Sequence, residues 1–235
     1  MGKRVQGVVL KTLRGRAARE ALVGLSRFHY RAGEPASVSR VLAAVDRAGS
    51  VVGVLCVSFP ALNASWRGAA WPGLFDGARC PRGRAAVLNA QVRTISRVII
   101  DPRWRGVGLA SALVRAYLEK PETARTEAVA SMGRLCPLFE SAGMRRVDVA
   151  PSARDARFTQ VLDRVGVRAS ALVEVSAARG AIRRHGAVAR GVAAWARESR
   201  ATRRHLLEGR ERLIDLGILA AQRACGRGRS VYVSP

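Results

Sequence analysis

The sequence has few acidic residues and almost no lysine. Acidic residues number 17 against 41 lysines and arginines, so the 235-residue chain carries a formal net charge of +24. Only Lys3, Lys11 and Lys120 are lysines. A GC-rich coding sequence explains arginine in place of lysine, but it does not explain the excess of cations over anions. The excess predicts a polyanionic partner, and nucleic acid is favoured over an anionic membrane because arginine pairs with phosphate groups.

Cysteine and histidine are also scarce. The four cysteines, Cys56, Cys80, Cys136 and Cys225, lack the paired spacing of a metal knuckle or a disulfide framework. No set of His, Asp and Glu has a recognisable metal-ligand spacing, so we expect no metal site. Cys136 is expected to pack inside the fold. These absences predict a protein of the reducing cytoplasm.

Long hydrophobic runs are missing as well. The densest apolar run, Val51 to Phe59, is too short to span a bilayer. The first 16 residues are charged throughout and lack the apolar stretch of a signal peptide. We therefore expect no membrane association. With 49% hydrophobic residues, the chain nevertheless has enough apolar material to fold.

The chain changes character near residue 150. Residues 151–235 contain 17 arginines and 7 acidic residues, a net charge of +10, which leaves +14 for residues 1–150. The sequence therefore predicts a domain over 1–150 and a basic, mainly helical C-terminal extension over 151–235. The arginines of the extension, Arg183, Arg184, Arg190 and Arg197 among them, form either a phosphate-binding surface or ordinary solvated helix faces.

Hydrophobic periodicity predicts an α/β fold. Strands are expected at about 5–13, 37–45, 51–59, 94–101, 126–130, 144–149 and 231–233, with a hairpin joining the second and third. Helices are expected at about 17–28, 107–120, 135–142, 154–165, 175–199 and 202–224. Residues 61–87 are rich in Gly, Pro and Trp and are expected to be irregular.

The most informative segment lies between a predicted strand and a predicted helix. It contains Arg103, Arg105, Gly106, Val107 and Gly108. Glycines allow the backbone to approach an anion, and the free amides at a helix start favour negative charge. The segment predicts a site for a pyrophosphate, although a GxG turn by itself is also an ordinary tight turn.

Two motifs in order resemble the GNAT superfamily of N-acetyltransferases. Val98 to Ala110 resembles the motif that binds the pyrophosphate of coenzyme A, and Leu138-Phe-Glu-Ser-Ala-Gly-Met144 resembles the motif that follows it. The resemblance covers about residues 15–150. It implies a mixed, mainly antiparallel central sheet flanked by helices and an acetyl-CoA or other acyl-CoA donor. The implied cofactor contacts are Val98, Ile99, Ile100, Arg103, Arg105, Gly106, Val107, Gly108, Leu109 and Ala110.

One departure from the family concerns the mechanism. Many GNAT enzymes carry a tyrosine at the position of Phe139, and that hydroxyl is thought to protonate the departing thiolate. Phenylalanine has no proton to give. Either another group serves, or the thiol leaves with the help of water, or the reaction is not plain acetyl transfer.

A narrower resemblance concerns the acceptor. Segments around Phe28 to Gly33, Ile95 to Val98, Glu127 to Met132 and Pro137 to Met144 resemble a GNAT subgroup. The subgroup includes acetyltransferase-like domains fused to ABC-type ATPases and, more distantly, the Mom-type phage proteins that modify adenine in DNA. This resemblance implies roles for His29, Tyr30, Arg97 and, less securely, Phe139.

Four residues are candidates for the chemistry on the acceptor. His29 is the best-placed general base because its ordinary pKa lies near neutral pH, although it could equally cap a helix. Tyr30 could donate a proton or pack on an amphipathic face. Arg97 either faces substrate or lies on a solvated face. Glu127 is either a base in the acceptor cleft or the partner of an arginine in a salt bridge.

Tryptophans of the irregular segment offer a further possibility. Trp66 and Trp71 could stack on a nucleobase, since a base in a duplex must leave the stack to be modified. The commoner role of such residues is to anchor a long loop on the core.

Together the sequence predicts an acyltransferase that uses a CoA-type donor and modifies an amine on nucleic acid, DNA rather than RNA. Two alternatives remain open. The first is an N-acetyltransferase acting on small-molecule or protein amines. The second is a nucleic-acid-binding protein that retains the fold without the chemistry.

Overall fold

The chain divides into two compact units. A computed structural model describes residues 7–29, 35–130, 133, 136–149, 152–207, 209–225 and 230–234. The first unit, which we call the sheet unit, comprises residues 1–149 together with 229–235, and the second, the helical insert, comprises residues 150–228.

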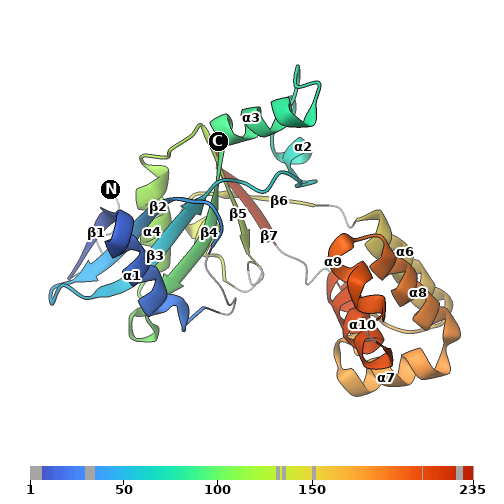
Figure 1. Cartoon of the computed structure of the whole chain (residues 1–235). Helices are drawn as coiled ribbons and strands as arrows, with labels where there is room; N and C mark the ends of the chain where they lie inside the picture. The colour runs from blue at the N-terminus through green and yellow to red at the C-terminus, as the bar shows by residue number, and fades with distance from the viewer. Residues whose placement is uncertain are drawn as a thin grey trace. The chain divides into compact units, whose positions relative to one another are not determined.

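The sheet unit is built on seven strands, namely β1 (Val8–Leu13), β2 (Val38–Asp46), β3 (Val51–Ser58), β4 (Val92–Ile100), β5 (Arg125–Ala130), β6 (Arg145–Val147) and β7 (Ser230–Ser234) (Figure 1). Their order across the sheet is β1-β2-β3-β4-β5-β7-β6. Every neighbouring pair is antiparallel except β4 and β5, which are parallel. The expected mixed, mainly antiparallel sheet flanked by helices is confirmed.

The β2–β3 hairpin shows how local chemistry sets the register. Asp46 and Ser50 close the turn: the Ser50 amide donates to Asp46 Oδ1 at 2.8 Å, and the Asp46 amide donates to the Ser50 carbonyl at 3.0 Å. Gly49 has a φ of +83°, a value that glycine adopts without the steric cost of a side chain. The predicted hairpin is therefore confirmed.

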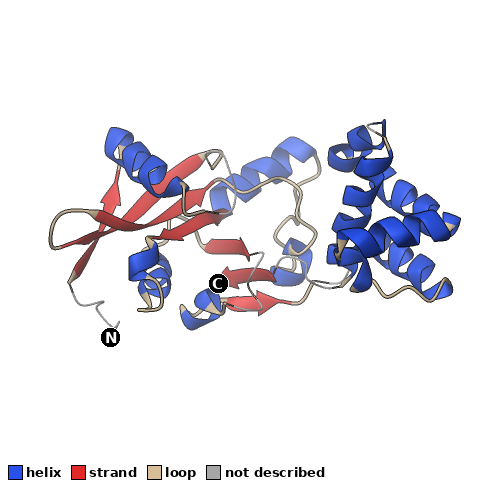
Figure 2. Cartoon of the chain, turned by 90° about the horizontal axis from the view of Figure 1, so that it is seen from below, coloured by secondary structure: helices blue, strands red, loops and turns tan. Residues whose placement is uncertain are grey.

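Helices cover both faces of the sheet (Figure 2). Successive residues of a strand point to opposite faces, and β2 divides in this way. Its residues Val41 and Ala43 pack in a cluster with α1 (Gly15–Ser26), whereas Leu42 packs in a cluster with α4 (Leu109–Leu118). The two helices therefore cover opposite faces of the sheet.

The segment expected to be irregular contains helices. It forms α2 (Arg67–Ala70) and α3 (Pro81–Gln91). Pro81 occupies the first turn of α3, where its missing N–H costs nothing, and the Cys80 sulfur accepts from the Gly83 amide at 3.3 Å. The prediction was wrong because Leu88 is the one buried residue of α3, which leaves too weak a hydrophobic period to read.

The helical insert is not a C-terminal extension in the structure. It lies in the chain between β6 and β7, and the last strand, which the sequence interpretation grouped with the extension, pairs with β5 and β6. The insert contains α6 (Ala153–Arg164), α7 (Val175–Arg184), α8 (Gly186–Arg197), α9 (Arg200–Arg203) and α10 (Arg210–Ala224). The single helix predicted over 175–199 breaks at His185, and the one over 202–224 also divides.

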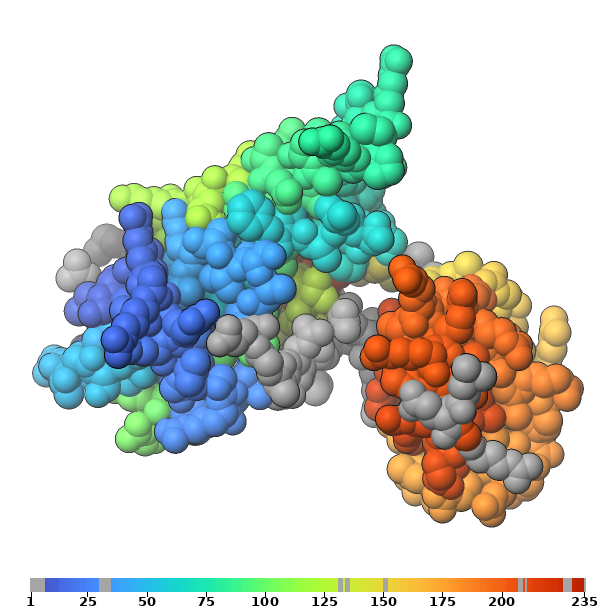
Figure 3. Space-filling model, viewed as in Figure 1, coloured from blue at the N-terminus to red at the C-terminus, as the bar shows by residue number. Residues whose placement is uncertain are grey.

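The insert has its own hydrophobic core and forms a rounded body in the space-filling view (Figure 3). Trp195 of α8 lies at the centre with 2% of its surface exposed. Its indole N–H donates to Asp155 Oδ1 at 2.7 Å. The second Asp155 oxygen accepts from the hydroxyl of Ser152, which caps α6. One carboxylate therefore ties the start of α6 to the last turn of α8.

We predict that Asp155→Ala lowers the free energy of unfolding by about 3 kcal/mol, because it leaves the buried indole N–H without an acceptor. Urea unfolding followed by circular dichroism measures the loss. Asp163→Ala is the matched control, since Asp163 is exposed on the same helix, and its effect should stay within about 0.5 kcal/mol. Equal losses in the two variants would contradict the assignment.

Candidate active site

The two parallel strands separate in the middle of the sheet. β4 pairs with β5 from Val92 and Arg125 up to Ile95 and Ala128, and no later pair joins them within the described residues. The separation coincides with a bulge in β4. Val57 lies opposite Ile95 and Cys56 opposite Arg97, so Ser96 is an extra residue. A bulge bends its strand, and it leaves the later peptide groups of β4 without ladder partners from β5.

A glycine turn follows the end of β4. Gly106 and Gly108 have φ values of +82° and +81°, which disfavour any residue with a side chain. A Cβ atom at either position would meet nothing within 4 Å. The turn is therefore open to solvent, and glycine is required by the backbone rather than by crowding.

The glycine turn leads directly into α4. Gly108 caps this helix without a side-chain hydrogen bond, and its first turn contains no acidic residue. The first amides of a helix have no partner within the helix and carry the positive end of its dipole. Leu109 is 1% exposed, so the helix start is anchored in the core while its amides remain free to hold an anion.

Two arginines frame the turn. Arg103 binds Asp101 through Nε at 3.1 Å and Nη2 at 2.9 Å, while its own side chain stays 82% exposed. Arg105 donates from Nε to the Ile100 carbonyl at 3.2 Å and from Nη2 to the Phe28 carbonyl at 3.4 Å. Arg105 thus links the end of α1 to the glycine turn.

Asp101 is the acidic member of this region. Its hydrogen bonds from the side chain and the amide of Arg103 lower the pKa of the carboxyl from 3.8 to about 2. The carboxylate also caps the short helix η1 (Pro102–Trp104) by accepting from the Arg103 amide at 3.0 Å. It thereby fixes the chain where it leaves β4.

Phe139 lies on α5 (Leu138–Ser141) and is buried next to α4. Ser111 of α4 donates to the Leu138 carbonyl at 3.2 Å, which ties the two helices together. The Phe139 ring lies 5.2 Å from the ring of Tyr232, centroid to centroid. The Tyr232 hydroxyl is buried and donates to the Gly133 carbonyl at 2.9 Å. Both rings therefore pack in the core between the sheet and α4.

The acceptor candidates lie in different settings. His29 follows the end of α1 and is half-buried, and its neighbour Phe28 contacts Arg105. Arg97 is 8% exposed on β4, next to the bulge and opposite Cys56. Burial raises the pKa of the Cys56 thiol to about 12 despite the opposing charge of Arg97. Tyr30 lies outside the described residues.

The structure places Glu127 in a salt bridge, which was the alternative to its role as a base. Arg67 donates to both carboxylate oxygens, from Nη2 at 2.7 Å and from Nε at 2.9 Å. Trp66 Nε1 donates at 3.1 Å and the Thr94 hydroxyl at 2.7 Å. With 1% of its surface exposed, Glu127 is held by these four hydrogen bonds.

Contacts in the same region assign a structural role to Trp66 and Trp71. Trp66 donates to Glu127, and Trp71 is 9% exposed in a cluster with Leu74 and Leu88. Both tryptophans anchor the segment between β3 and β4 on the sheet unit. The sequence interpretation did not identify Arg67 as the partner of Glu127, because nothing in the sequence relates Arg67 to a residue 60 positions later.

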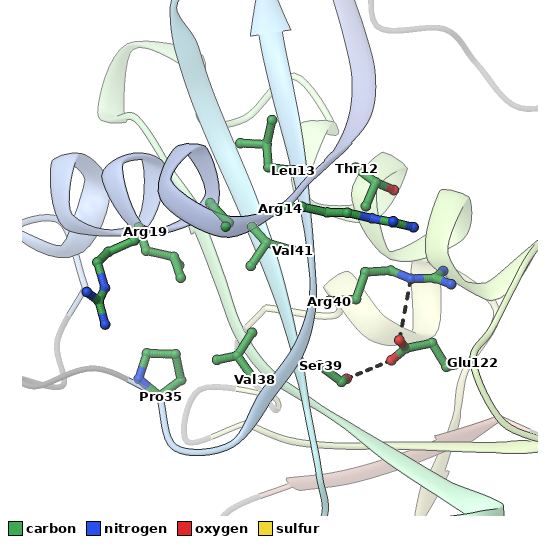
Figure 4. Close-up of a pocket in the computed structure, with 13 residues that line it drawn as sticks. Thr12, Leu13, Arg14, Arg19, Pro35, Val38, Ser39, Arg40, Val41 and Glu122 are labelled. Atoms are coloured by element: carbon green, nitrogen blue, oxygen red, sulfur yellow. Dashed lines mark hydrogen bonds and ion pairs between the residues drawn. The ribbon is translucent and has the colours of Figure 1, made fainter.

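A cavity of about 520 Å³ lies elsewhere in the sheet unit. Leu13, Leu22 and Val41 form its apolar wall, and Arg14 and Arg40 project at its edge (Figure 4). Glu122 accepts from Ser39 at 2.7 Å beside it. The cavity adjoins the end of β1 and the start of β2. It therefore lies at the end of the sheet opposite to the glycine turn, and its lining contains none of the residues predicted from the sequence.

No group of His, Cys, Asp and Glu that could hold a metal ion occurs among the described residues. Among those residues there is likewise no helix long and apolar enough to cross a bilayer.

Cys136 is exposed rather than packed inside, because it precedes α5 in an irregular segment instead of starting a buried helix.

No protein-family model matches this chain, and no curated protein matches it. A solved structure from Deinococcus radiodurans R1, described as a "putative acetyltransferase", is similar with a TM-score of 0.38 and 14% sequence identity. The match covers 63% of this chain and 90% of that chain. A similarity of this size assigns no activity to the chain.

We predict that Glu127→Gln destabilises the fold by about 3 to 5 kcal/mol, because it leaves Arg67 buried without a counter-charge. Chemical unfolding measures the loss. Glu122→Gln is the control: Glu122 is half-buried and its ion pairs with Arg40 and Arg93 are 3.7 Å and 3.6 Å long, so a loss of about 1 kcal/mol or less is expected. A stable Glu127→Gln variant that has lost only acyl transfer would instead identify Glu127 as the base.

We also predict an acid-sensitive contribution from Asp101. Its folded pKa of about 2 lies below the usual 3.8, so the stabilisation by Arg103 is complete above the unfolded pKa. It is lost as the pH falls from about 4 to about 2. The free energy of unfolding should decline more steeply over this range in the natural protein than in Asp101→Asn. Identical slopes would show that the Asp101–Arg103 contact does not persist in solution.

Proposed function

We propose that the sheet unit is an N-acyltransferase that takes its acyl group from a CoA thioester. One observation carries this proposal: β4 leaves β5 at the Ser96 bulge and is followed, after η1, by a glycine turn that begins α4 without a side-chain cap. The open edge of β4 offers peptide groups to an extended ligand, and the turn offers amides to an anion. A thioester carrier with a pyrophosphate needs an open strand edge for its extended arm and, next to that edge, amides for its pyrophosphate.

The pyrophosphate would be held at the start of α4. The amides of Leu109 and Ala110 supply hydrogen-bond donors, and Arg103 and Arg105 supply positive charge beside them. Val98, Ile99 and Ile100 lie on the part of β4 beyond the bulge, where the alternate peptide groups that point away from β3 can bind the extended arm of the donor. A strand amide at this edge also polarises the thioester carbonyl.

The transfer itself forms one bond and breaks one. The lone pair of an amine nitrogen attacks the thioester carbon, the C–N bond forms, and the C–S bond breaks as the thiolate leaves. The amine gives up a proton, and His29 is the proposed acceptor because its ordinary pKa lies near neutral pH. Tyr30 and Arg97 are proposed to orient the acceptor. Glu127 has no part in this scheme, because four donors already occupy its oxygens.

The acceptor is proposed to be an amine on nucleic acid, DNA rather than RNA. The net charge of +24 supports this choice, since basic charge supplies most of the sequence-independent affinity for nucleic acid. Phe139 supports a rival function, in which the protein binds nucleic acid without chemistry. Its ring cannot protonate the leaving thiolate, so in the proposed reaction that proton comes from solvent.

The first test is donor binding. Isothermal titration calorimetry with acetyl-CoA should show binding to the natural protein. Gly106→Asp should weaken it by about 2 kcal/mol, which is a factor of about 30 in Kd, because it puts negative charge against the pyrophosphate and strains the backbone. Gly49→Asp is the matched control: its φ is +83°, it also has open space around it, and it lies in the β2–β3 turn.

Two further results decide the proposal. Absence of acetyl-CoA binding, or equal binding by both aspartate variants, would overturn the assignment of the donor site. The acceptor is tested by incubating the protein with acetyl-CoA and DNA, followed by mass spectrometry of the digested nucleosides. An acetylated nucleoside supports the nucleic-acid acceptor. Unmodified nucleosides from a protein that binds acetyl-CoA would refute that acceptor while leaving the donor site in place.

A further inference from the structure

The helical insert does more than close a turn. β6 and β7 are antiparallel neighbours, with Val147 opposite Val231. Such a pair needs only a few residues to join it, yet residues 148–229 lie between these strands. This connection contains a folded unit with its own core around Trp195. Because the sheet does not require it, the insert must serve some other purpose.

Charge is distributed unevenly over the insert. On one side, the acidic residues of α10 neutralise nearby arginines: Glu211 binds Arg179 at 3.0 Å, and Asp215 binds Arg212 at 3.2 Å. Glu198, at the end of α8, is bound by Arg157 of α6 at 2.7 Å. These carboxylates therefore do little to screen the other arginines.

The solvent-facing side of α8 carries unneutralised charge. Gly186, Arg190, Ala194 and Arg197 recur at intervals of three and four residues and are all exposed, so they form one stripe along the helix. Neither arginine of the stripe pairs with an acidic residue among those described. Both arginines are exposed, and the one residue of the stripe between them is the small Ala194. Arg183 and Arg184, at the end of α7, precede the stripe in the chain. They are also exposed and likewise pair with no acidic residue among those described.

The dimensions of the stripe suit a line of phosphates. Arg190 and Arg197 are separated by seven residues, which is about 10 Å along the helix axis. Duplex DNA carries a negative charge about every 1.7 Å along its axis, and arginine binds phosphate through paired hydrogen bonds. A membrane-binding helix would instead present large apolar side chains beside its cations, whereas this stripe presents only Gly186 and Ala194.

We infer that the exposed stripe of α8, together with Arg183 and Arg184, binds the phosphate backbone of nucleic acid. The insert is thus a binding module for the acceptor, set into a hairpin of the transferase. This inference deepens the proposed function, because it names the part of the chain that holds the substrate's phosphates. Its contacts are to the backbone, so it predicts affinity without sequence preference.

The test compares two double variants of the full chain with the same net charge. Arg190→Gln/Arg197→Gln removes the stripe, and Arg179→Gln/Arg212→Gln removes two arginines that are neutralised by α10. Fluorescence anisotropy with a short labelled DNA duplex should show about a tenfold to fiftyfold loss of affinity for the first variant at about 0.1 M salt. The slope of log K against log salt should become shallower by about 2. The control variant should change affinity by less than about threefold.

Several outcomes would overturn the inference. Equal losses in the two double variants would mean that only net charge matters, and no binding of duplex by the natural protein would remove the premise. Binding of phosphatidylserine vesicles in place of DNA would assign the stripe to a membrane. Acetyl-CoA binding, measured by calorimetry on the same variants, should be unchanged. This measurement separates a failure of the proposed nucleic-acid binding by the stripe from a failure of the proposed acetyl-CoA binding at the glycine turn.

Discussion

The structure depends on how the backbone of β4 shares its hydrogen bonds. One edge of β4 pairs with β3 along most of its length, while the other edge pairs with β5 only as far as Ile95. Peptide groups that lose a ladder partner must find another, in water or in a ligand. The extra residue at Ser96 produces this situation. The candidate donor site therefore follows from a single irregularity in strand pairing.

The paired end of the same two strands is held by side chains. Glu127 of β5 joins Thr94 of β4 to Arg67 and Trp66 of the segment between β3 and β4. A buried carboxylate is tolerated only when its charge and its lone pairs are satisfied, and all four donors are needed here. The network fixes β4 and β5 together at one end, so that they diverge only beyond the bulge.

Sequence patterns predicted the parts of the site that are local. Gly106 and Gly108 lie within three residues of each other, and the strand before them and the helix after them have clear hydrophobic periods. The partners of Glu127 and Phe139 could not be predicted in the same way. Arg67 lies 60 residues before Glu127, and Tyr232 lies beyond the whole helical insert from Phe139. Such pairings depend on the packing of distant segments, which a single sequence does not contain.

The sequence by itself determined the sheet-forming segments, the glycine turn before α4 and the excess of positive charge, because each depends on residues close together or on composition. Only the tertiary structure decided that Ser230–Ser234 is a strand of the central sheet and that the basic helices interrupt a hairpin. It also decided which arginines are neutralised and which remain open, as with Arg179 and Arg190. The physical reason is that strand pairing and ion pairing are contacts through space, and their energies depend on burial and distance rather than on sequence position.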